Sequence, residues 1–376
     1  MPLHGLPVSA ALRGVVKMRE QLKKFIRGWV AFLNRRADRA MTRAMIWSIR
    51  SGSRKEFERR SCKLSKEQTV AIKNFWNRYT KKNLPLFQGL YSCMHGSFDV
   101  RYLPDDLYLT KILRHLNKRE YAILTNKCLQ PLLFNCPQPE TIFMRMEGGY
   151  YDASYKVISR EQALSLFLQA GDAIFKPATS THSGKGIQFF SSTDRQEASQ
   201  FLDHHFEDVT NYIVQKVVKQ HPSLAAIHEA SVNCLRVMTL LVDGKARVVA
   251  TVLKMGAGGS QVDNLGFGGI VCGVKEDGTL RDFAFSANGD RFDRHPQGFD
   301  FKGYAVPSYR EVQEMAIEMA ERVPYTRLIA WDIAVDEDGR PLLIEYNDIG
   351  ELGFMQYTCG PLFGDYTERI LSEIFG

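Results

Sequence analysis

The 376-residue chain lacks any apolar run long enough to cross a bilayer. A membrane-spanning helix needs about 20 apolar residues, whereas the apolar runs here, such as Val248–Leu253, are far shorter. The N-terminus lacks the apolar stretch and cleavage site of a signal peptide, so we expect a cytoplasmic protein. With 44% hydrophobic and 24% charged residues, the composition is that of a globular protein and excludes wholesale disorder.

Cysteine is scarce, and its spacing follows no known pattern. The seven cysteines form no CxxC pair, which excludes a disulfide-rich mini-protein and predicts reduced thiols. They are Cys62, Cys93, Cys128, Cys136, Cys234, Cys272 and Cys359. The Walker A pattern GxxxxGK[ST] and the Rossmann pattern GxGxxG are also absent, so neither of these two nucleotide-binding motifs is expected.

Negative charge is scarce at the beginning of the chain. Residues 1–60 hold 15 Lys and Arg against 4 Asp and Glu, whereas the remainder holds 34 against 38. Between Ala10 and Ile49, apolar residues recur at steps of three and four, which predicts a basic amphipathic helix. Such a helix suits an anionic membrane surface, an acidic partner, a second copy of the chain, or docking on its own domain. Nucleic acid is not expected as a partner, because the rest of the chain has no basic surface signal.

The pattern of the chain changes twice along its length. Ser51–Ser53 is predicted to end the first helix, and Ser65 is a plausible N-cap for the next one. After about Asn126, short β-rich runs such as Leu235–Val242 and Ile270–Val274 alternate with helical patterns, which predicts an α+β body. We therefore expect a basic helical arm over residues 1–60, a mostly helical region over 61–125 and a further domain over 126–376.

A predicted hairpin near the C-terminus carries two carboxylates. Asp338-Gly339 between alternating strands is typical of a two-residue turn, which places Asp332 opposite Glu345 and Asn347 on the same face. The other face would turn toward a core and carry Ile333, Val335, Leu342 and Ile344. Two carboxylates so close need a cation, and hard oxygen donors suit Mg²⁺ or Mn²⁺. The alternative is a hydrated surface hairpin.

Upstream, an apolar strand ends at Lys176 and leads into a loop with two glycines, Thr179–Ile187. Its hydroxyls, its cation and its open backbone N–H groups suit phosphate oxygens, although the pattern alone favours an ordinary turn. Lys176 is either a phosphate ligand or a surface lysine. Arg236, near the start of another apolar strand, offers a planar fork for phosphate.

Taken in order, these pieces resemble the ATP-grasp superfamily over about residues 120–375. The resemblance rests on Asn126-Lys127, Lys176-Pro177, Ser183–Ile187, Gln215–Val218, Ser231–Arg236, Asp332, Glu345 and Asn347. The chain is more narrowly similar to the sugar-transfer-associated ATP-grasp group, through Asn264, Gly268-Gly269-Ile270, His295-Pro296, Ala305–Pro307, Gln356 and Gly360–Leu362. The resemblance implies two α+β lobes that grip ATP, a lid lobe at about residues 170–220 and a metal-binding lobe at about 230–376.

The resemblance also implies a role for each matching residue. ATP would be bound by Lys127, Lys176, Ser183, Gly184, Lys185, Gly186, Ile187, Gln215, Lys216, Val217, Val218, His221 and Asn233. One or two Mg²⁺ ions, or Mn²⁺ in their place, would be held by Asp332, Glu345 and Asn347. Arg236 would stabilise the transferring phosphoryl group, with Lys254 near the acceptor. The loop Gly256–Gly269 would shape the acceptor pocket, unless it is only a long surface loop.

These implied parts predict an ADP-forming carboxylate–amine ligase. A carboxylate would attack the γ-phosphorus of ATP to form an acyl phosphate, which an amine then converts to an amide. The family name suggests substrates linked to cell-surface polysaccharides or sugar precursors. One alternative is a small-molecule kinase on the same fold. Another is a non-catalytic nucleotide-binding protein that uses the basic arm to reach a membrane or a partner.

Overall fold

The computed structural model describes residues 38–81, 85–179, 186–204 and 211–376. The chain forms two compact units, residues 1–60 and 61–376. In the first unit, residues 38–59 form one helix on which Met41 and Trp47 are largely exposed. The expected break at Ser51–Ser53 is wrong, because a glycine costs a helix only about 1 kcal/mol and the helix continues. The apolar stripe that precedes Asp38 lies outside the described residues.

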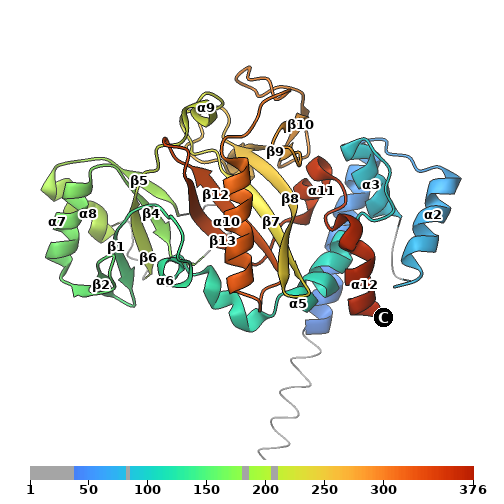
Figure 1. Ribbon diagram of the computed structural model, residues 1–376, viewed down its shortest axis with the longest axis horizontal. Coiled ribbons are helices and arrows are strands. Elements are labelled where there is room, and N and C mark those ends of the chain that lie inside the picture. Colours follow the sequence, from blue (N-terminus) through green and yellow to red (C-terminus); the bar gives the residue numbers. More distant parts are fainter. Residues whose placement is uncertain (1–37, 82–84, 180–185, 205–210) are drawn as a thin grey trace, which may run out of the picture. The chain divides into compact units, whose positions relative to one another are not determined.

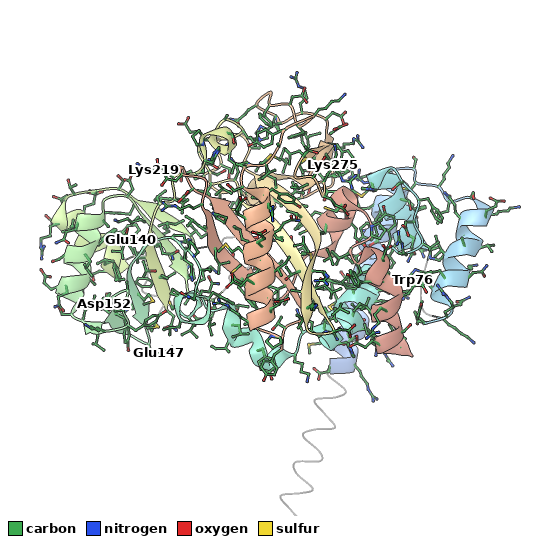
Figure 2. All side chains as sticks on the ribbon, viewed as in Figure 1. Trp76, Glu140, Glu147, Asp152, Lys219 and Lys275 are labelled. Atoms are coloured by element: carbon green, nitrogen blue, oxygen red, sulfur yellow. A yellow bond between two sulfur atoms is a disulfide. The ribbon has the colours of Figure 1, made fainter. Side chains whose placement is uncertain are left out.

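The second unit begins with helices. They are α2 (Lys66–Trp76), α3 (Leu86–His95), α4 (Asp105–Leu107), η1 (Tyr108–Ile112), α5 (Leu113–Leu116), η2 (Arg119–Thr125) and α6 (Gln130–Leu133). Ser65 caps α2 as predicted, because its side chain accepts from the backbone N–H of Gln68 and the Gln68 side chain accepts from that of Ser65. Trp76 is fully buried in this helical region (Figure 2), and its indole N–H donates to the carbonyl of Val100 at 2.8 Å.

Two cysteines in this region depart from the sequence-based prediction. Cys62 and Cys93 form a disulfide, so the prediction of seven reduced thiols is wrong for this pair. Their separation of 31 residues carries no spacing signal, because the pair meets only when α3 folds back toward the segment before α2. The other five cysteines are free thiols, as predicted.

A six-stranded antiparallel sheet follows, in the order β3-β2-β1-β6-β4-β5 (Figure 1). Its strands are β1 (Thr141–Met146), β2 (Gly149–Tyr151), β3 (Val157–Ile158), β4 (Ala173–Pro177), β5 (Gln188–Phe190) and β6 (Tyr212–Lys216). Helices α7 (Arg160–Ala170) and α8 (Arg195–His204) cover one face, where aromatic rings such as Phe167 and Phe175 form the core. The other face carries Lys176 and Gln215, which leaves polar groups for a site.

A seven-stranded sheet forms the rest of the unit, in the order β11-β10-β9-β8-β7-β12-β13. Its strands are β7 (Leu235–Val242), β8 (Lys245–Met255), β9 (Ile270–Val274), β10 (Leu280–Ser286), β11 (Arg291–Phe292), β12 (Leu328–Val335) and β13 (Pro341–Asn347). The helices around it are α9 (Pro222–Ala225), η3 (Leu265–Phe267), α10 (Tyr309–Arg322), α11 (Leu352–Cys359), η4 (Gly364–Tyr366) and α12 (Thr367–Phe375). Both β7 and β9 have the predicted bounds.

Side-chain alternation assigns the two faces of this sheet to different cores. Val237 and Ile329 pack with α10 on one face. Met238 and Ala330 point to the other face and pack with α11, α12 and the N-terminal helices of this unit. Within the described ranges, no helix is both long and apolar enough to cross a membrane.

The predicted hairpin β12–β13 is present, with a different turn. Asp332 pairs with Glu345 as predicted, but Ile333 pairs with Leu343, so a bulge interrupts β13 between these two pairs. The turn contains three residues rather than two, because the N–H of Asp336 donates to the carbonyl of Arg340. The prediction that Leu342 and Ile344 face the core is therefore wrong. The core positions of β13 are Leu343 and Tyr346, beside the correctly predicted Ile333 and Val335.

Candidate functional site

Four charged side chains form a row across four adjacent strands of the second sheet. Lys254 lies on β8, Arg236 on β7, Asp332 on β12 and Glu345 on β13. Asp332 is the cross-strand partner of both Arg236 and Glu345, so all of these side chains project from the same face. Farther along the strands, apolar side chains on this face pack against the N-terminal helices of the unit. The charged row occupies the other end of the same face.

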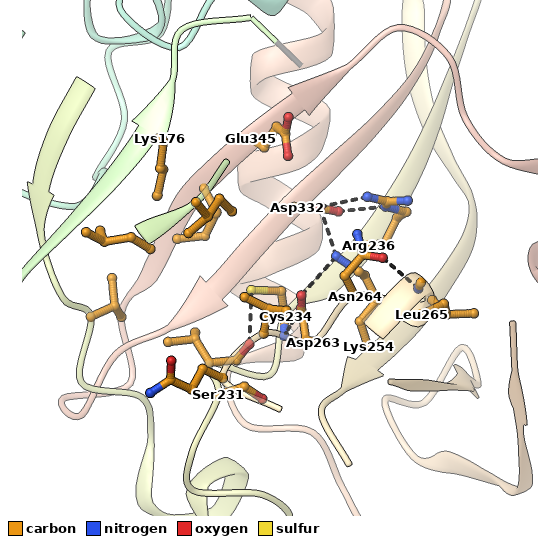
Figure 3. Close-up of a pocket in the computed structure, with 18 of the residues that line it drawn as sticks. Lys176, Ser231, Cys234, Arg236, Lys254, Asp263, Asn264, Leu265, Asp332 and Glu345 are labelled. Atoms are coloured by element: carbon orange, nitrogen blue, oxygen red, sulfur yellow. Dashed lines mark hydrogen bonds and ion pairs between the residues drawn. The ribbon is translucent and has the colours of Figure 1, made fainter. Parts of the chain in front are cut away.

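Asp332 is the most strongly held carboxylate of the row (Figure 3). Its Oδ1 accepts from Nε of Arg236 at 2.7 Å, and its Oδ2 accepts from Nη2 of Arg236 at 2.8 Å and from Nζ of Lys254 at 3.2 Å. Burial alone would raise the pKa of Asp332, but the two cations lower it well below its usual range. The carboxylate therefore stays ionised and paired.

Lys254 bridges two carboxylates. Its Nζ also lies 3.2 Å from Oδ1 of Asp263, which belongs to the loop after β8. Burial alone would lower the pKa of Lys254, but the flanking Asp263 and Asp332 raise it, so the ammonium remains charged. Arg236, Asp332, Lys254 and Asp263 thus form a continuous chain of alternating charge.

The first sheet contributes cations with fewer partners. Nζ of Lys176 donates to Oε1 of Gln215 at 3.0 Å and forms no ion pair with any described residue. Burial and the nearby charge of Lys127 lower the pKa of Lys176 to about 8. Lys127, on the segment before α6, reaches across to Glu345, with its Nζ 2.7 Å from Oε1. Lys176 lies on the side of Glu345 away from Arg236 (Figure 3).

A pocket of about 810 Å³ collects these groups. Among the predicted residues, its lining includes Lys127, Lys176, Ile187, Lys216, Val217, Val218, Arg236, Lys254, Asp332, Glu345 and Asn347. The segment after β6 forms one wall, and the ammonium of Lys216 pairs with Glu140 at 2.8 Å. The Lys216 side chain is therefore already occupied, which leaves the backbone of this segment to face a ligand.

The structure does not bring every predicted residue into this pocket. His221 accepts from the N–H of Ser223 and caps α9, and the amide of Asn233 is hydrogen-bonded to the carbonyl of Leu224 and the N–H of Gly256. Neither residue lines the pocket. Gly186 has a positive φ of 87° beside Pro177, at the end of the predicted lid. The lid residues Ser183, Gly184 and Lys185 lie outside the described residues.

Sequence reasoning missed Asp263. A side chain at Gly269 would place its Cβ 2.6 Å from the carbonyl oxygen of Asp263, so only glycine lets the loop close at this point. Oδ2 of Asp263 also accepts from the backbone N–H of Cys234 at 3.2 Å. The sequence signal for this residue is the Asp263-Asn264 pair ahead of Gly268-Gly269. This pair does not indicate in which direction the carboxylate points.

The donor set is compatible with Mg²⁺. Glu345 and Asn347 present hard oxygen donors beside Asp332, and Nδ2 of Asn347 is buried without a hydrogen-bond partner among the described residues. Over the same residues, no group of three or more His, Cys, Asp and Glu side chains could hold a metal. A site of two carboxylates and one carboxamide suits an ion that keeps water and phosphate oxygens as ligands.

Comparisons with known proteins identify a family and several similar solved structures. The model of a family described as sugar-transfer-associated ATP-grasp matches residues 110–365. The solved ATP-grasp ligase PsnB, complexed with a precursor peptide, is 14% identical with a TM-score of 0.39, covering 68% of this chain and 62% of that one. D-alanyl-alanine synthetase A from Vibrio cholerae is 15% identical with a TM-score of 0.39, covering 67% and 64%. The chain thus spans less than two thirds of these two structures, and no curated protein matches it.

Proposed function

Because this chain belongs to the sugar-transfer-associated ATP-grasp family, we propose that it is an ADP-forming ligase. It activates a carboxylate as an acyl phosphate and transfers the acyl group to an amine. The observation that carries the proposal is the single pocket in which Lys127, Lys176 and Arg236 meet Asp332 and Glu345. Cations arranged around carboxylates suit a metal-bound triphosphate, because both charge types are needed there.

The chain's own residues have distinct tasks in this reaction. Lys127 and Lys176 bind phosphate oxygens, and the backbone of Lys216–Val218 lies along the adenine. Arg236 stabilises charge on the transferring phosphoryl group through the guanidinium N–H groups that do not bind Asp332. Gly186 and Ile187 belong to the lid, which excludes water from the acyl phosphate. Asn233 acts indirectly, since its side chain holds the backbone around Gly256.

Asp332, Glu345 and Asn347 would hold one or two Mg²⁺ ions, with Mn²⁺ as a substitute. The metal, when bound, supplies positive charge that neutralises the triphosphate. Positive charge beside these carboxylates also comes from Lys127, Lys254 and Arg236. Lys127 is therefore placed to exchange Glu345 for a phosphate oxygen when nucleotide enters.

We also propose a division of the chain into functional regions. Residues 126–376 form the ATP-grasp domain, with a lid lobe at about 170–220 and a metal-binding lobe at about 230–376. A helical region at 61–125 supports the metal-binding lobe, since the hydroxyl of Tyr108 donates to the carbonyl of Gly350 and Nδ2 of Asn117 to that of Asp348. The family description favours a carboxylate or amine linked to a sugar precursor.

The basic arm at residues 1–60 is proposed to contact an anionic membrane from the cytoplasmic side. Trp47 is 73% exposed on a helix that also carries Arg43, Arg50 and Arg54, and an indole among arginines suits a lipid headgroup layer. Co-sedimentation with phosphatidylglycerol vesicles, but not with phosphatidylcholine vesicles, would support this contact. If the Trp47→Ala variant sediments with phosphatidylglycerol vesicles as fully as the wild type, the result would argue against this contact.

The ligase is tested by trapping its intermediate. We would incubate the full chain with ATP, Mg²⁺, hydroxylamine and a pool of carboxylates and sugar acids, and measure ADP and hydroxamate together. Equal amounts of both products are expected, because hydroxylamine captures an acyl phosphate. ADP without hydroxamate that depends on added hydroxyl compounds would instead indicate a kinase. Nucleotide binding without either product would favour a non-catalytic role.

A further inference from the structure

Asp263 has no task in the chemistry described so far, although it lines the same pocket. Figure 3 shows it on the side of Lys254 away from Arg236, whereas Asn264 and Leu265, which follow it in the chain, lie back toward Arg236. The triphosphate-binding lysines belong to the other wall, on the first sheet and before α6. Asp263 is therefore in contact with Lys254, the lysine expected near the acceptor, and lies on a different wall from the proposed phosphate-binding lysines.

Two contacts fix the position of this carboxylate, and one backbone hydrogen bond closes the loop behind it. Oδ1 lies 3.2 Å from Nζ of Lys254, and Oδ2 accepts from the N–H of Cys234 at 3.2 Å. The backbone behind it is closed by the hydrogen bond from Gly269 N–H to the carbonyl of Asn264. Since each carboxylate oxygen can accept two hydrogen bonds, both oxygens keep capacity for a further donor. The side chain is 13% exposed, which gives a donor in the pocket access to it.

We propose that Asp263 is the general base of the ligase and that it removes a proton from the ammonium group of the acceptor. The assignment rests on the proposed ligase function and names a catalytic residue for its second step. An amine arrives protonated at neutral pH and cannot attack until one proton has left. The carboxylate of Glu351, which also lines the pocket, adds negative charge that favours a cationic acceptor.

The step balances as follows in atoms and charge. The ammonium gives one proton to a carboxylate oxygen of Asp263, and the freed nitrogen lone pair forms a bond to the acyl carbon. The bond between that carbon and the phosphate oxygen breaks, and the phosphate leaves with the second nitrogen proton. Asp263 then returns its proton to water. Burial raises the pKa of Asp263 against the opposing effect of Lys254, which makes the carboxylate a better proton acceptor.

The test compares two kinds of nucleophile in Asp263→Asn. Hydroxylamine is uncharged at neutral pH and needs no base before it attacks, whereas methylamine, ethanolamine and glycine ethyl ester range from fully to partly protonated. Using a carboxylate that yields hydroxamate with the wild type, we expect amide formation from methylamine to fall about 100-fold in the variant. Hydroxamate formation is expected to fall less than about fivefold, because its rate does not depend on proton removal by Asp263.

Two further variants separate chemistry from structure. Asp263→Glu keeps a carboxylate, so its rate of amide formation is expected to be at least tenfold higher than that of Asp263→Asn. Asp293→Asn removes an exposed carboxylate and serves as a control. An equal loss with hydroxylamine and methylamine would overturn the assignment and make Asp263 a partner that only positions Lys254. Wild-type hydroxamate without amide from any of the amines would overturn it too. Absence of hydroxamate in the wild type would instead refute the ligase itself.

Discussion

The two lysines that face each other across the pocket are equally buried but differ in their surroundings. Lys176, on the first sheet, has an amide partner, no ion pair among the described residues, and a pKa lowered to about 8. Lys254, on the second sheet, lies between Asp263 and Asp332, which raise its pKa against the effect of burial. The first wall thus holds a lysine that forms no ion pair with a described residue, and the second holds a lysine flanked by two carboxylates.

Because of this difference, the first wall serves mainly to bind ligand, and the second wall mainly holds the strands together. A buried ammonium without a carboxylate is unfavourable until an anion arrives, so the first wall gains most from nucleotide. On the second wall, the ion pairs of Asp332 with Arg236 and Lys254 hold the three strands β7, β8 and β12 in register. Substitutions on the first wall should therefore change ligand binding and turnover, whereas those on the second should also change stability.

The largest effect is expected for Glu345→Gln, on the side nearest the first wall. Loss of this carboxylate removes a proposed metal ligand, so ADP formation should fall by about 1000-fold or more. The unfolding free energy should change by less than about 1 kcal/mol, because the Glu345 side chain, which pairs with Lys127, is partly solvated. Steady-state ADP release and urea unfolding measure the two quantities. Unchanged turnover would remove Glu345 from the metal site.

A large loss of stability is expected for Asp332→Asn on the second wall. The change leaves Arg236 buried with only the more distant Glu351 at 3.8 Å, and Lys254 with only Asp263, which should cost about 3–5 kcal/mol of unfolding free energy. Chemical denaturation of this variant beside Lys176→Met tests the comparison directly. The Lys176→Met variant should lose nucleotide affinity while its unfolding midpoint stays the same or rises, because the change removes a buried charge. Similar midpoints for both variants would contradict the division into two kinds of wall.

The smallest effect is a pH dependence of nucleotide binding. Phosphate binds the charged form of Lys176, whose pKa in the free protein is about 8, so binding above that pH must take up a proton. The ATP dissociation constant should therefore rise by up to about tenfold per pH unit above pH 8 and change little below it. Lys176→Arg should flatten this profile, since a guanidinium stays charged. Calorimetric titration without metal at several pH values measures it, and a flat wild-type profile would oppose this role.

In the β12–β13 hairpin, the predicted pairing of Asp332 with Glu345 is correct although the predicted turn length is wrong. Asp332 was expected opposite Glu345 from a two-residue turn, but the turn has three residues. The bulge in β13 restores the register, so the pairing of these two residues is nevertheless as predicted. Leu342 and Ile344, on the turn side of the Asp332–Glu345 pair, were assigned to the wrong face because a shift of one residue reverses the side chain.

The side-chain contacts of several other residues could not be predicted from the local sequence pattern. His221 and Asn233 stand next to matched motifs, yet their side chains complete hydrogen bonds to nearby backbone groups. Asp263 belongs to a loop whose direction depends on the close approach of Gly269. The Cys62–Cys93 pair likewise joins two segments that approach only in the folded chain. Each case depends on contacts between distant elements rather than on a short sequence period.

The sequence by itself determined the elements and the chemistry that they carry. Apolar alternation specifies β7 and β12, and the residue types Asp332, Glu345 and Asn347 specify hard oxygen donors. Only the tertiary structure decided which of these charges are paired, because an ion pair depends on distances between strands and loops that no local pattern encodes. Lys176 and Lys254 read alike in the sequence, and their opposite pKa shifts arise from the carboxylates that folding places beside one and not beside the other.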